Sequence, residues 1–321
     1  MDLLNPYALL IYFLLTLWRF IMKTTWSKIA LALGFIASSS AFSIAHAESL
    51  VGLTINNQIG VFSSRNVAAA SFVNISGLSE GESLIGIDLR PSNNTIYGIS
   101  TANNIYTLNV SSTGVFGAAT FVKALDMSII NPSLSYGFDF NPAADFAGGA
   151  SLRLVSSAGN NYAINASTGA IAFSGNIADG NYSAVAYTNS TPAGAPAPGA
   201  TMLYYVDAID NTLNKNVSPG TFNMPNILEV GKLDENIGSI NGFEIFANGN
   251  AFLAATLRDG RGKTKLFDVD LDTGEAEDFD GEFDYVLRGL AAAPSAVPVP
   301  AAAWLFGSAL LGLAGFRRKF A

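Results

Sequence analysis

Apolar and polar residues alternate in short runs between residues 48 and 293, and turn-forming residues separate these runs. Thr95–Ser100 and Ile105–Asn109 are two such runs, and Asn103 and Asn104 lie in the turn between them. A period of two places alternate side chains on opposite faces of a strand, whereas a helix needs apolar residues every three or four positions. No convincing amphipathic helix occurs in this region. The pattern therefore predicts an all-β domain over residues 48–293.

One strand motif recurs along this domain, an apolar strand that contains Gly-x-Asp or a relative of it. The copies are Gly86–Pro91, Gly137–Pro142, a weaker one at Ala184–Asn189, Gly242–Phe246 and Gly289–Ala292. Their spacings are 51, 47 or 48, 57 or 58, and 47 residues. Repeats of about 40–50 residues are typical of the four-stranded blades of a propeller.

A second motif follows the first in three units, where a Thr-Gly pair comes after an alternating strand. The pairs are Thr113-Gly114, Thr168-Gly169 and Thr273-Gly274. Glycine reaches the positive φ angles that tight hairpins need, so each pair predicts a turn between two strands.

The first unit is incomplete, with three strands predicted at Leu50–Ile55, Gln58–Phe62 and Ala70–Ile75. Leu287–Ala292, at the other end of the domain, would supply the fourth strand and leave no open sheet edge. We therefore predict a five-bladed β-propeller closed by pairing of its N- and C-terminal strands. A six-bladed propeller is the first alternative to this fold, and a β-sandwich or a solenoid is the second.

The N-terminal region has the layout of a secretory signal peptide over residues 22–47. Lys23 and Lys28 precede a short apolar run, and Ala45-His46-Ala47 forms an A-x-A site, which predicts cleavage before Glu48. Residues 1–21 are interpreted as an upstream extension, with an additional hydrophobic segment as the alternative.

The C-terminal region begins with a linker and short motif over residues 294–300 and continues with an apolar run and a basic end over residues 301–321. With the motif added, the run reaches the ~20 residues of a transmembrane helix. Val297-Pro298-Val299-Pro300, the run and the basic end resemble a PEP-CTERM sorting signal, although the family usually has Glu where Val299 stands. The resemblance implies an exosortase-type processing enzyme as a partner, transient inner-membrane anchoring, and a Gram-negative host that makes extracellular polysaccharide.

The domain itself also resembles an uncharacterised family of secreted bacterial propeller-like domains, known only as a domain of unknown function. The matching stretches are Leu84–Pro91, Ile105–Gly114, Tyr136–Pro142, Leu152–Ser156, Ala186–Asn189, Leu203–Asp207, Gly242–Ile245 and Arg288–Ala291. The resemblance implies a propeller outside the cell and carries no catalytic residues.

Charge and composition narrow the chemistry of the presumed mature part, residues 48–297. Six of the 17 basic residues lie in the two ends, which leaves 11 basic against 24 acidic residues and a net charge of −13. Such a surface argues against nucleic acid as a partner. The chain has no Cys, and its one His is His46 in the signal. Nucleophile systems that need His or Cys, zinc sites built on these ligands, and disulfides are therefore excluded from the mature part.

Two groups of acidic residues are candidates for cation binding. Asp268, Asp270 and Asp272 resemble the opening of a calcium loop, although they also suit an exposed strand that ends in the Thr-Gly turn. The exposed-strand interpretation is favoured because Thr273 stands where an EF-type loop needs Gly. No other cofactor is expected.

Asp88, Asp139 and Glu244 occupy equivalent places in three units and would converge if their strands line a central channel. Convergent carboxylates can bind a cation or a sugar, or serve a glycosidase as its acid–base pair. The favoured alternative is structural: each carboxylate bonds backbone amides of its own blade or of the next.

Few other residues carry candidate chemistry. Arg90, Arg153 and Arg288 are available to pair with these acids. Five tyrosines can stack on sugar rings or fill the space between blades, the more frequent role at strand spacing; they are Tyr97, Tyr106, Tyr162, Tyr204 and Tyr205. The sequence predicts an exported binding or structural module of the cell surface or extracellular matrix, for polysaccharide or matrix protein, with a channel glycan hydrolase or lyase as the alternative.

Overall fold

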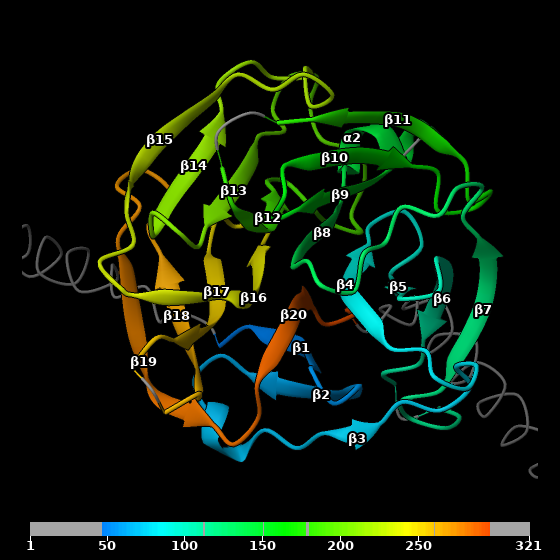
Figure 1. The fold of residues 1–321 in the computed structure, drawn as a ribbon, viewed down its shortest axis with the longest axis horizontal. Coiled ribbons are helices and arrows are strands. Elements are labelled where there is room, and N and C mark those ends of the chain that lie inside the picture. The colour runs from blue at the N-terminus through cyan, green and yellow to red at the C-terminus, as the bar shows by residue number, and fades with distance from the viewer. Residues whose placement is uncertain (1–46, 112, 150, 178–179, 260, 296–321) are drawn as a thin grey trace, which may run out of the picture. The chain divides into compact units, whose positions relative to one another are not determined.

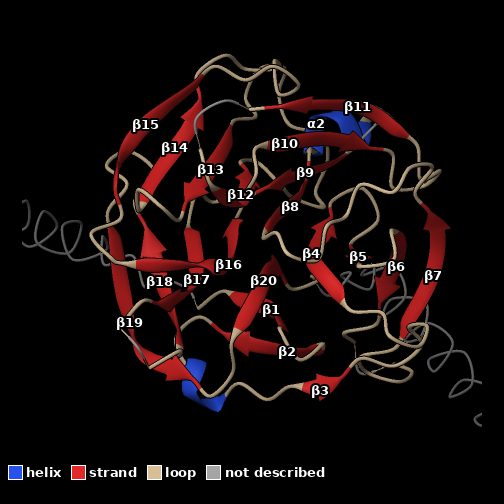
Figure 2. Ribbon diagram, viewed as in Figure 1, coloured by secondary structure: helices blue, strands red, loops and turns tan. Residues whose placement is uncertain are grey.

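The computed structural model describes residues 47–295, apart from residues 112, 150, 178–179 and 260. These residues form five four-stranded antiparallel sheets around a central axis, as Figure 1 shows. Nearly all regular structure of the described residues is strand, and their two short helices lie between strands (Figure 2). The predicted all-β, five-bladed propeller is confirmed, and the six-bladed, sandwich and solenoid alternatives are excluded.

In each sheet the four strands lie at increasing distance from the central axis, and we call them the inner, second, third and outer strands. The inner strands are β4 (Leu84–Arg90), β8 (Tyr136–Phe140), β12 (Tyr182–Tyr187), β16 (Ile237–Ile245) and β20 (Leu287–Ala292). The second strands are β5 (Thr95–Ser100), β9 (Leu152–Ser156), β13 (Leu203–Asp207), β17 (Ala251–Leu257) and β1 (Ser49–Thr54). The third strands are β6 (Asn104–Leu108), β10 (Asn160–Ile164), β14 (Thr212–Asn216), β18 (Thr264–Val269) and β2 (Gln58–Ser63). The outer strands are β7 (Ala119–Ala124), β11 (Ile171–Asn176), β15 (Ile227–Lys232), β19 (Ala276–Phe283) and β3 (Val73–Asn74).

The propeller is closed by the pairing of β20 with β1. The two strands are antiparallel, with Leu50 opposite Ala292 and Gly52 opposite Leu290. The Ala293 N–H extends the pairing by donating to the Ser49 carbonyl at 2.9 Å. The last strand of the domain thus completes the sheet of the first three, as the sequence predicts.

Turn residues fix the hairpins and also link neighbouring blades. The glycines of the three Thr-Gly pairs have φ angles of +82°, +76° and +86°, which confirms the predicted turns. Asn103 also has a positive φ, and its Oδ1 accepts the Ile129 N–H at 2.7 Å in the loop that leads to the next inner strand. The equivalent Asn57 accepts the Leu84 N–H at 3.0 Å, so each turn positions the start of the following blade.

Aromatic side chains fill the space between blades. The Tyr97 ring packs edge-on against Phe140 of the next blade, with 5.4 Å between ring centres. Tyr106, Tyr204 and Tyr205 are also buried in the apolar clusters. For these four tyrosines the structural interpretation is correct and sugar stacking is excluded, whereas Tyr162 is half-buried.

Some elements differ from the prediction. The strand predicted after the Thr113-Gly114 turn, β7, does not follow it directly and begins only at Ala119. The Asn109 side chain donates to the Thr113 and Val115 carbonyls and holds those residues in a loop. The predicted strand at 70–75 shortens to β3 behind the 3₁₀ helix η1 (Val67–Ala69). Helix α2 (Pro142–Phe146) was not expected; Asn141 caps it, and proline at its first position suits a helix start.

Candidate functional site

The inner strands carry equivalent residues at each height, so their side chains form layers along the channel. The mouth layer consists of Ile85, Tyr136, Ser183, Asn241 and Arg288, which line one pocket. The glycine layer follows with Gly86, Gly137, Ala184, Gly242 and Gly289. The carboxylate layer, two residues further along each strand, consists of Asp88, Asp139, Ala186, Glu244 and Ala291.

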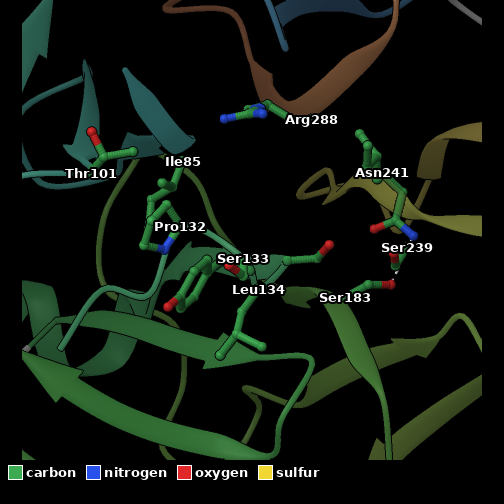
Figure 3. A pocket seen from close by; sticks show the side chains of 12 residues that line it. Ile85, Thr101, Pro132, Ser133, Leu134, Ser183, Ser239, Asn241 and Arg288 are labelled. Carbon is green, nitrogen blue, oxygen red and sulfur yellow. Dashed lines mark hydrogen bonds between the residues drawn. The ribbon is translucent and has the colours of Figure 1, made fainter. Parts of the chain in front are cut away.

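The mouth layer lines a pocket of about 260 Å³, which we call the mouth pocket (Figure 3). On one side, the wall of the mouth pocket is formed by the loop before β8, through Pro132, Ser133 and Leu134. On another side, a bulge in β16 presents Ser239 and Ile240. Bulges often redirect side chains beside binding sites, and this one widens the polar lining of the mouth pocket.

Among the described residues, Arg288 is the one charged side chain that lines the mouth pocket. Its Nη1 donates to the Leu84 carbonyl at 3.2 Å, and burial lowers its pKa. Within the described residues the ion pairs join other side chains, so this guanidinium has no carboxylate partner. Arginine stays protonated in proteins even when it is partly buried, so the mouth pocket carries a positive charge that no carboxylate compensates.

Asn241 supplies an acceptor to the same pocket. Its Nδ2 donates to Ser183 Oγ at 2.8 Å, the contact drawn as a dashed line in Figure 3, and to the Gly238 carbonyl at 3.1 Å. Its Oδ1 is buried and has no hydrogen-bond partner. Both Nδ2 hydrogens are used within the protein, so Oδ1 is the part of this amide left without a partner.

The glycine layer narrows the channel below the mouth pocket to a space of about 10 Å³. A Cβ on Gly137 would lie 2.6 Å from the Val185 nitrogen, and one on Gly86 would lie 2.8 Å from Phe138 Cβ. The inner strands approach each other this closely because side chains are absent here. The glycine of the recurring motif therefore sets the width of the channel.

The carboxylate layer brings Asp88, Asp139 and Glu244 together. One carboxylate oxygen from each lies within 4.8 Å of the others. The three residues are only 2%, 1% and 2% exposed. The predicted convergence of the three acids is confirmed, and we call them the carboxylate cluster.

Asp88 in this cluster bonds two backbone amides. Its Oδ1 accepts the Leu89 N–H of its own strand at 2.6 Å, and its Oδ2 accepts the Phe140 N–H of the next blade at 2.8 Å. The carboxylate therefore joins two adjacent inner strands, as the structural interpretation of the sequence predicts.

The other two carboxylates act in the same way. Asp139 accepts from the Tyr187 N–H of the next blade. Glu244 accepts from the Ala292 N–H of the next blade at 3.1 Å and from the Ile245 N–H of its own strand. With the two bonds of Asp88, the three carboxylates serve one N–H group from each of the five inner strands.

Burial dominates the acid–base behaviour of the cluster. It raises the pKa of Asp88 to about 7, although the Phe140 and Leu89 N–H groups lower that pKa. Burial and the neighbouring carboxylates also hold the pKa values of Asp139 and Glu244 well above their ordinary range. Glu244 and Asp88 share a hydrogen bond. The cluster therefore retains protons near neutral pH.

Comparison with known proteins places this domain in a family. The model of a family described as a domain of unknown function, DUF4394, matches residues 58–291. The chain belongs to the DUF4394 family. No curated protein matches this DUF4394 chain.

Solved structures similar to this DUF4394 chain have low sequence identity and low structural overlap. Candidate 6-phosphogluconolactonases from Bacteroides uniformis and Bacteroides fragilis are 14% and 13% identical, with TM-scores of 0.35 and 0.34. They cover 77% and 76% of this chain, and the matches span 71% and 70% of their own chains. A calcium-binding protein, regucalcin, from Agrobacterium tumefaciens is 15% identical with a TM-score of 0.37, covering 72% of this chain and 68% of its own. At these values the similarities carry no inference about the activity of the DUF4394 chain.

The other acidic group named from the sequence lies on the outside of this DUF4394 propeller. Asp268 is an exposed residue of β18, and Asp270 Oδ1 accepts the N–H groups of Asp272 and Thr273 at 2.8 and 2.9 Å. Asp270 thus stabilises the Thr-Gly turn, which agrees with the exposed-strand interpretation. Calcium binding at these residues stays a prediction.

The arginines named from the sequence do not pair with the carboxylate cluster. Arg90 Nε bonds Asp145 Oδ1 of α2 at 2.7 Å, and Arg153 bonds Asn161, Asn223 and Tyr187. Asp145 was missed because nothing in the repeat marks a helix at that point.

Sequence reasoning also missed the mouth pocket. Asn241 and Ser183 precede the landmark residues of their strands, where the five copies share no residue type. The signal available was positional: the residue before each landmark faces the same end of the channel.

The predicted N-terminal signal and C-terminal tail lie almost wholly outside the described residues. Ala45, the motif Val297–Pro300 and the helix over 301–321 are among the residues not described. Of the predicted cleavage site, Ala47 and Glu48 are described, and Glu48 precedes β1. No helix within the described ranges is long and apolar enough to cross a membrane.

Proposed function

We propose that this DUF4394 protein is an exported β-propeller that serves as a binding module at the cell surface or in the extracellular matrix. The A-x-A site at Ala45–Ala47 and the PEP-CTERM-like tail support export and sorting through an exosortase-type enzyme. The acidic mature part, without Cys or His, suits a soluble protein outside the cell. Its partner is extracellular polysaccharide, with a matrix protein or a purely structural role as the alternatives.

The mouth pocket is the observation that carries this proposal. Arg288 offers a positive charge without a carboxylate partner, and Asn241 Oδ1 offers an acceptor without a donor. A uronate-type sugar unit has a carboxylate for the guanidinium and hydroxyl groups for the acceptor. The pocket volume of about 260 Å³ suits one sugar unit rather than a long segment of chain. We therefore place an acidic sugar of the polysaccharide in the mouth pocket.

The alternative function is a glycan hydrolase or lyase that uses the carboxylate cluster. A hydrolase needs the glycosidic bond to lie between its two carboxyl groups. The cluster residues are at most 2% exposed, and the channel above them narrows to about 10 Å³ at the glycine layer. Because a sugar ring does not fit through such a passage, the geometry favours a binding module.

Replacement of Arg288 by glutamine tests the proposal. We expect R288Q to lower the affinity for an acidic polysaccharide such as alginate by about tenfold or more, because it removes the charge that pairs with the carboxylate. The matched control is R65Q, since Arg65 is an exposed arginine outside the mouth pocket and its loss changes net charge equally. Binding is measured by retention of the protein on immobilised polysaccharide at several salt concentrations.

Other outcomes would decide between the alternatives. Equal retention of R288Q, R65Q and wild-type protein would contradict binding in the mouth pocket. Release of soluble sugar by the wild-type protein, lost in D88N, would favour the hydrolase. A neutral polysaccharide serves as the comparison ligand, and we expect its retention to be the same for R288Q and wild type.

A further inference from the structure

The carboxylate cluster has the dimensions of a cation site. An ion equidistant from three oxygens 4.8 Å apart would lie about 2.8 Å from each, close to the ~2.3–2.6 Å that Ca²⁺ prefers. Since 4.8 Å is the upper limit of the separation, a small closure of the side chains would bring the oxygens to full coordination distance. The donor atoms are all carboxylate oxygens, which suit a hard cation.

Asp139 provides the second observation. Its Oδ1 is buried and has no hydrogen-bond partner, and the residue is 1% exposed. An ionised carboxylate oxygen only accepts, so it needs a donor or a cation, and a buried polar atom left with neither is costly. Asp139 belongs to the cluster, with one carboxylate oxygen within 4.8 Å of oxygens of Asp88 and Glu244.

No basic side chain of the described residues compensates the cluster. The polar neighbours of Asp88, Asp139 and Glu244 are other carboxylates, backbone N–H groups and Tyr187, and the ion pairs of the described residues lie elsewhere. Arg153 stands opposite Asp139 on β9 but forms no ion pair with it and bonds Tyr187, Asn161 and Asn223 instead. Buried charges are normally paired or coordinate a metal. Three acids that repel one another at this distance therefore require either protons or a cation.

The amide bonds do not use every oxygen of the cluster. Ala186 and Ala291 stand in the carboxylate layer of the other two blades, whose N–H groups are bonded by Asp139 and Glu244. Asp139 Oδ1 has no such partner, and a neutral asparagine at this position would keep an acceptor for the Tyr187 N–H. The negative charge of Asp139 therefore exceeds what its amide bond needs.

We propose that Asp88, Asp139 and Glu244 bind a divalent cation, with Ca²⁺ as the preferred ion, inside the channel below the glycine layer. The site is separate from the mouth pocket and does not depend on the binding of polysaccharide. It would join three of the five inner strands through one ion, so its effect is on the stability of the ring. It also differs from the acidic turn at Asp268–Asp272.

The experiment compares the purified full chain with two variants, D139N and D270N. Each protein is unfolded, freed of metal with EDTA, refolded with or without millimolar CaCl₂, and then dialysed. Refolding lets the ion enter before the ring closes around the buried site. D139N keeps the side-chain shape and one acceptor for the Tyr187 N–H but loses the charge, whereas D270N removes the same charge from the exposed turn. Melting temperature and bound calcium per chain are measured.

We expect CaCl₂ to raise the melting temperature of wild-type protein and D270N by about 5 °C or more, with one calcium retained per chain. D139N should show neither the shift nor the retained ion, and E244Q should behave as D139N does if the latter refolds poorly. The same melting temperature for wild-type protein with and without Ca²⁺, Mg²⁺ or Mn²⁺ would overturn the proposal. So would a shift that persists in D139N and E244Q and disappears in D270N.

Discussion

At the scale of single residues, Asp88 has two opposing influences on its ionisation. Its two backbone N–H bonds and its hydrogen bond with Glu244 favour the charged carboxylate, whereas its burial favours the protonated acid. Burial has the larger effect, since the pKa is raised to about 7. A carboxyl group in an unfolded chain has a pKa near 4, so the folded protein binds this proton more tightly.

The stability of the metal-free protein should therefore depend on pH. A carboxyl group with a raised pKa stabilises the fold fully at acidic pH, and this contribution is lost as pH rises through the folded value of about 7. We expect the free energy of unfolding to fall by roughly 1.4 kcal/mol per pH unit for each such proton between about pH 5 and pH 7. Urea unfolding in EDTA at several pH values measures the slope.

The D88N variant is the control for this effect, because an amide cannot titrate. It should be less stable than wild type at about pH 5, where it lacks one acceptor, and its slope should be smaller. Asp139 and Glu244 remain in this variant, so part of the slope persists. A wild-type stability that rises from pH 5 to pH 8 would contradict the expected sign.

At the scale of strands, the glycine layer decides how closely the blades approach. The backbone of β12 packs directly against Gly137 and leaves no room for a side chain there. We expect G137A to lower the free energy of unfolding by about 1–3 kcal/mol, because the added methyl group forces two inner strands apart. Thermal unfolding by circular dichroism measures the change.

Gly149 supplies the matched control for G137A. A Cβ at Gly149 would have its nearest neighbour at 3.6 Å, and its φ is not positive, so G149A should change stability little. Equal destabilisation by both variants would mean that strand spacing at the glycine layer is not limiting. Ala184 already occupies the equivalent place in β12, so an alanine is tolerated in that blade.

The strands that repeat were predictable from sequence, and so was the carboxylate cluster. Residues at one register of a repeat face the same channel, which is why Asp88, Asp139 and Glu244 could be grouped before any coordinates. The mouth pocket depends instead on the loop at Pro132–Leu134 and on a bulge in β16 that is longer than the register shifts at the same end of β4 and β12. The pattern does not predict strands β14, β15 and β19, because polar and charged residues interrupt the alternation in their sequences.

At the scale of the whole molecule, the pairing of β20 with β1 holds the ring together. A chain that ends at Val286 would lack β20, leaving β1 with an open edge and removing one wall of the channel. We expect residues 47–286 to lose the cooperative unfolding transition and to aggregate, because exposed strand edges pair between molecules. Calorimetry and size-exclusion chromatography would measure both effects.

Residues 47–295 are the matched control, since they differ only by the closing strand and three residues after it. This chain should unfold in one transition and elute as a single folded species. If the shorter chain unfolds with the same enthalpy and midpoint, the closing strand contributes little and the four remaining blades are sufficient.

The position of β20 in the sequence also sets the timing of folding during synthesis. Strand β1 leaves the ribosome roughly 230 residues before β20, and a bacterial or eukaryotic ribosome adds about 5–20 residues per second. The first sheet therefore waits on the order of ten seconds or more for its innermost strand. During that interval the ring is still open, so a chaperone can bind the nascent chain or a translocation pore can accept it before the fold closes.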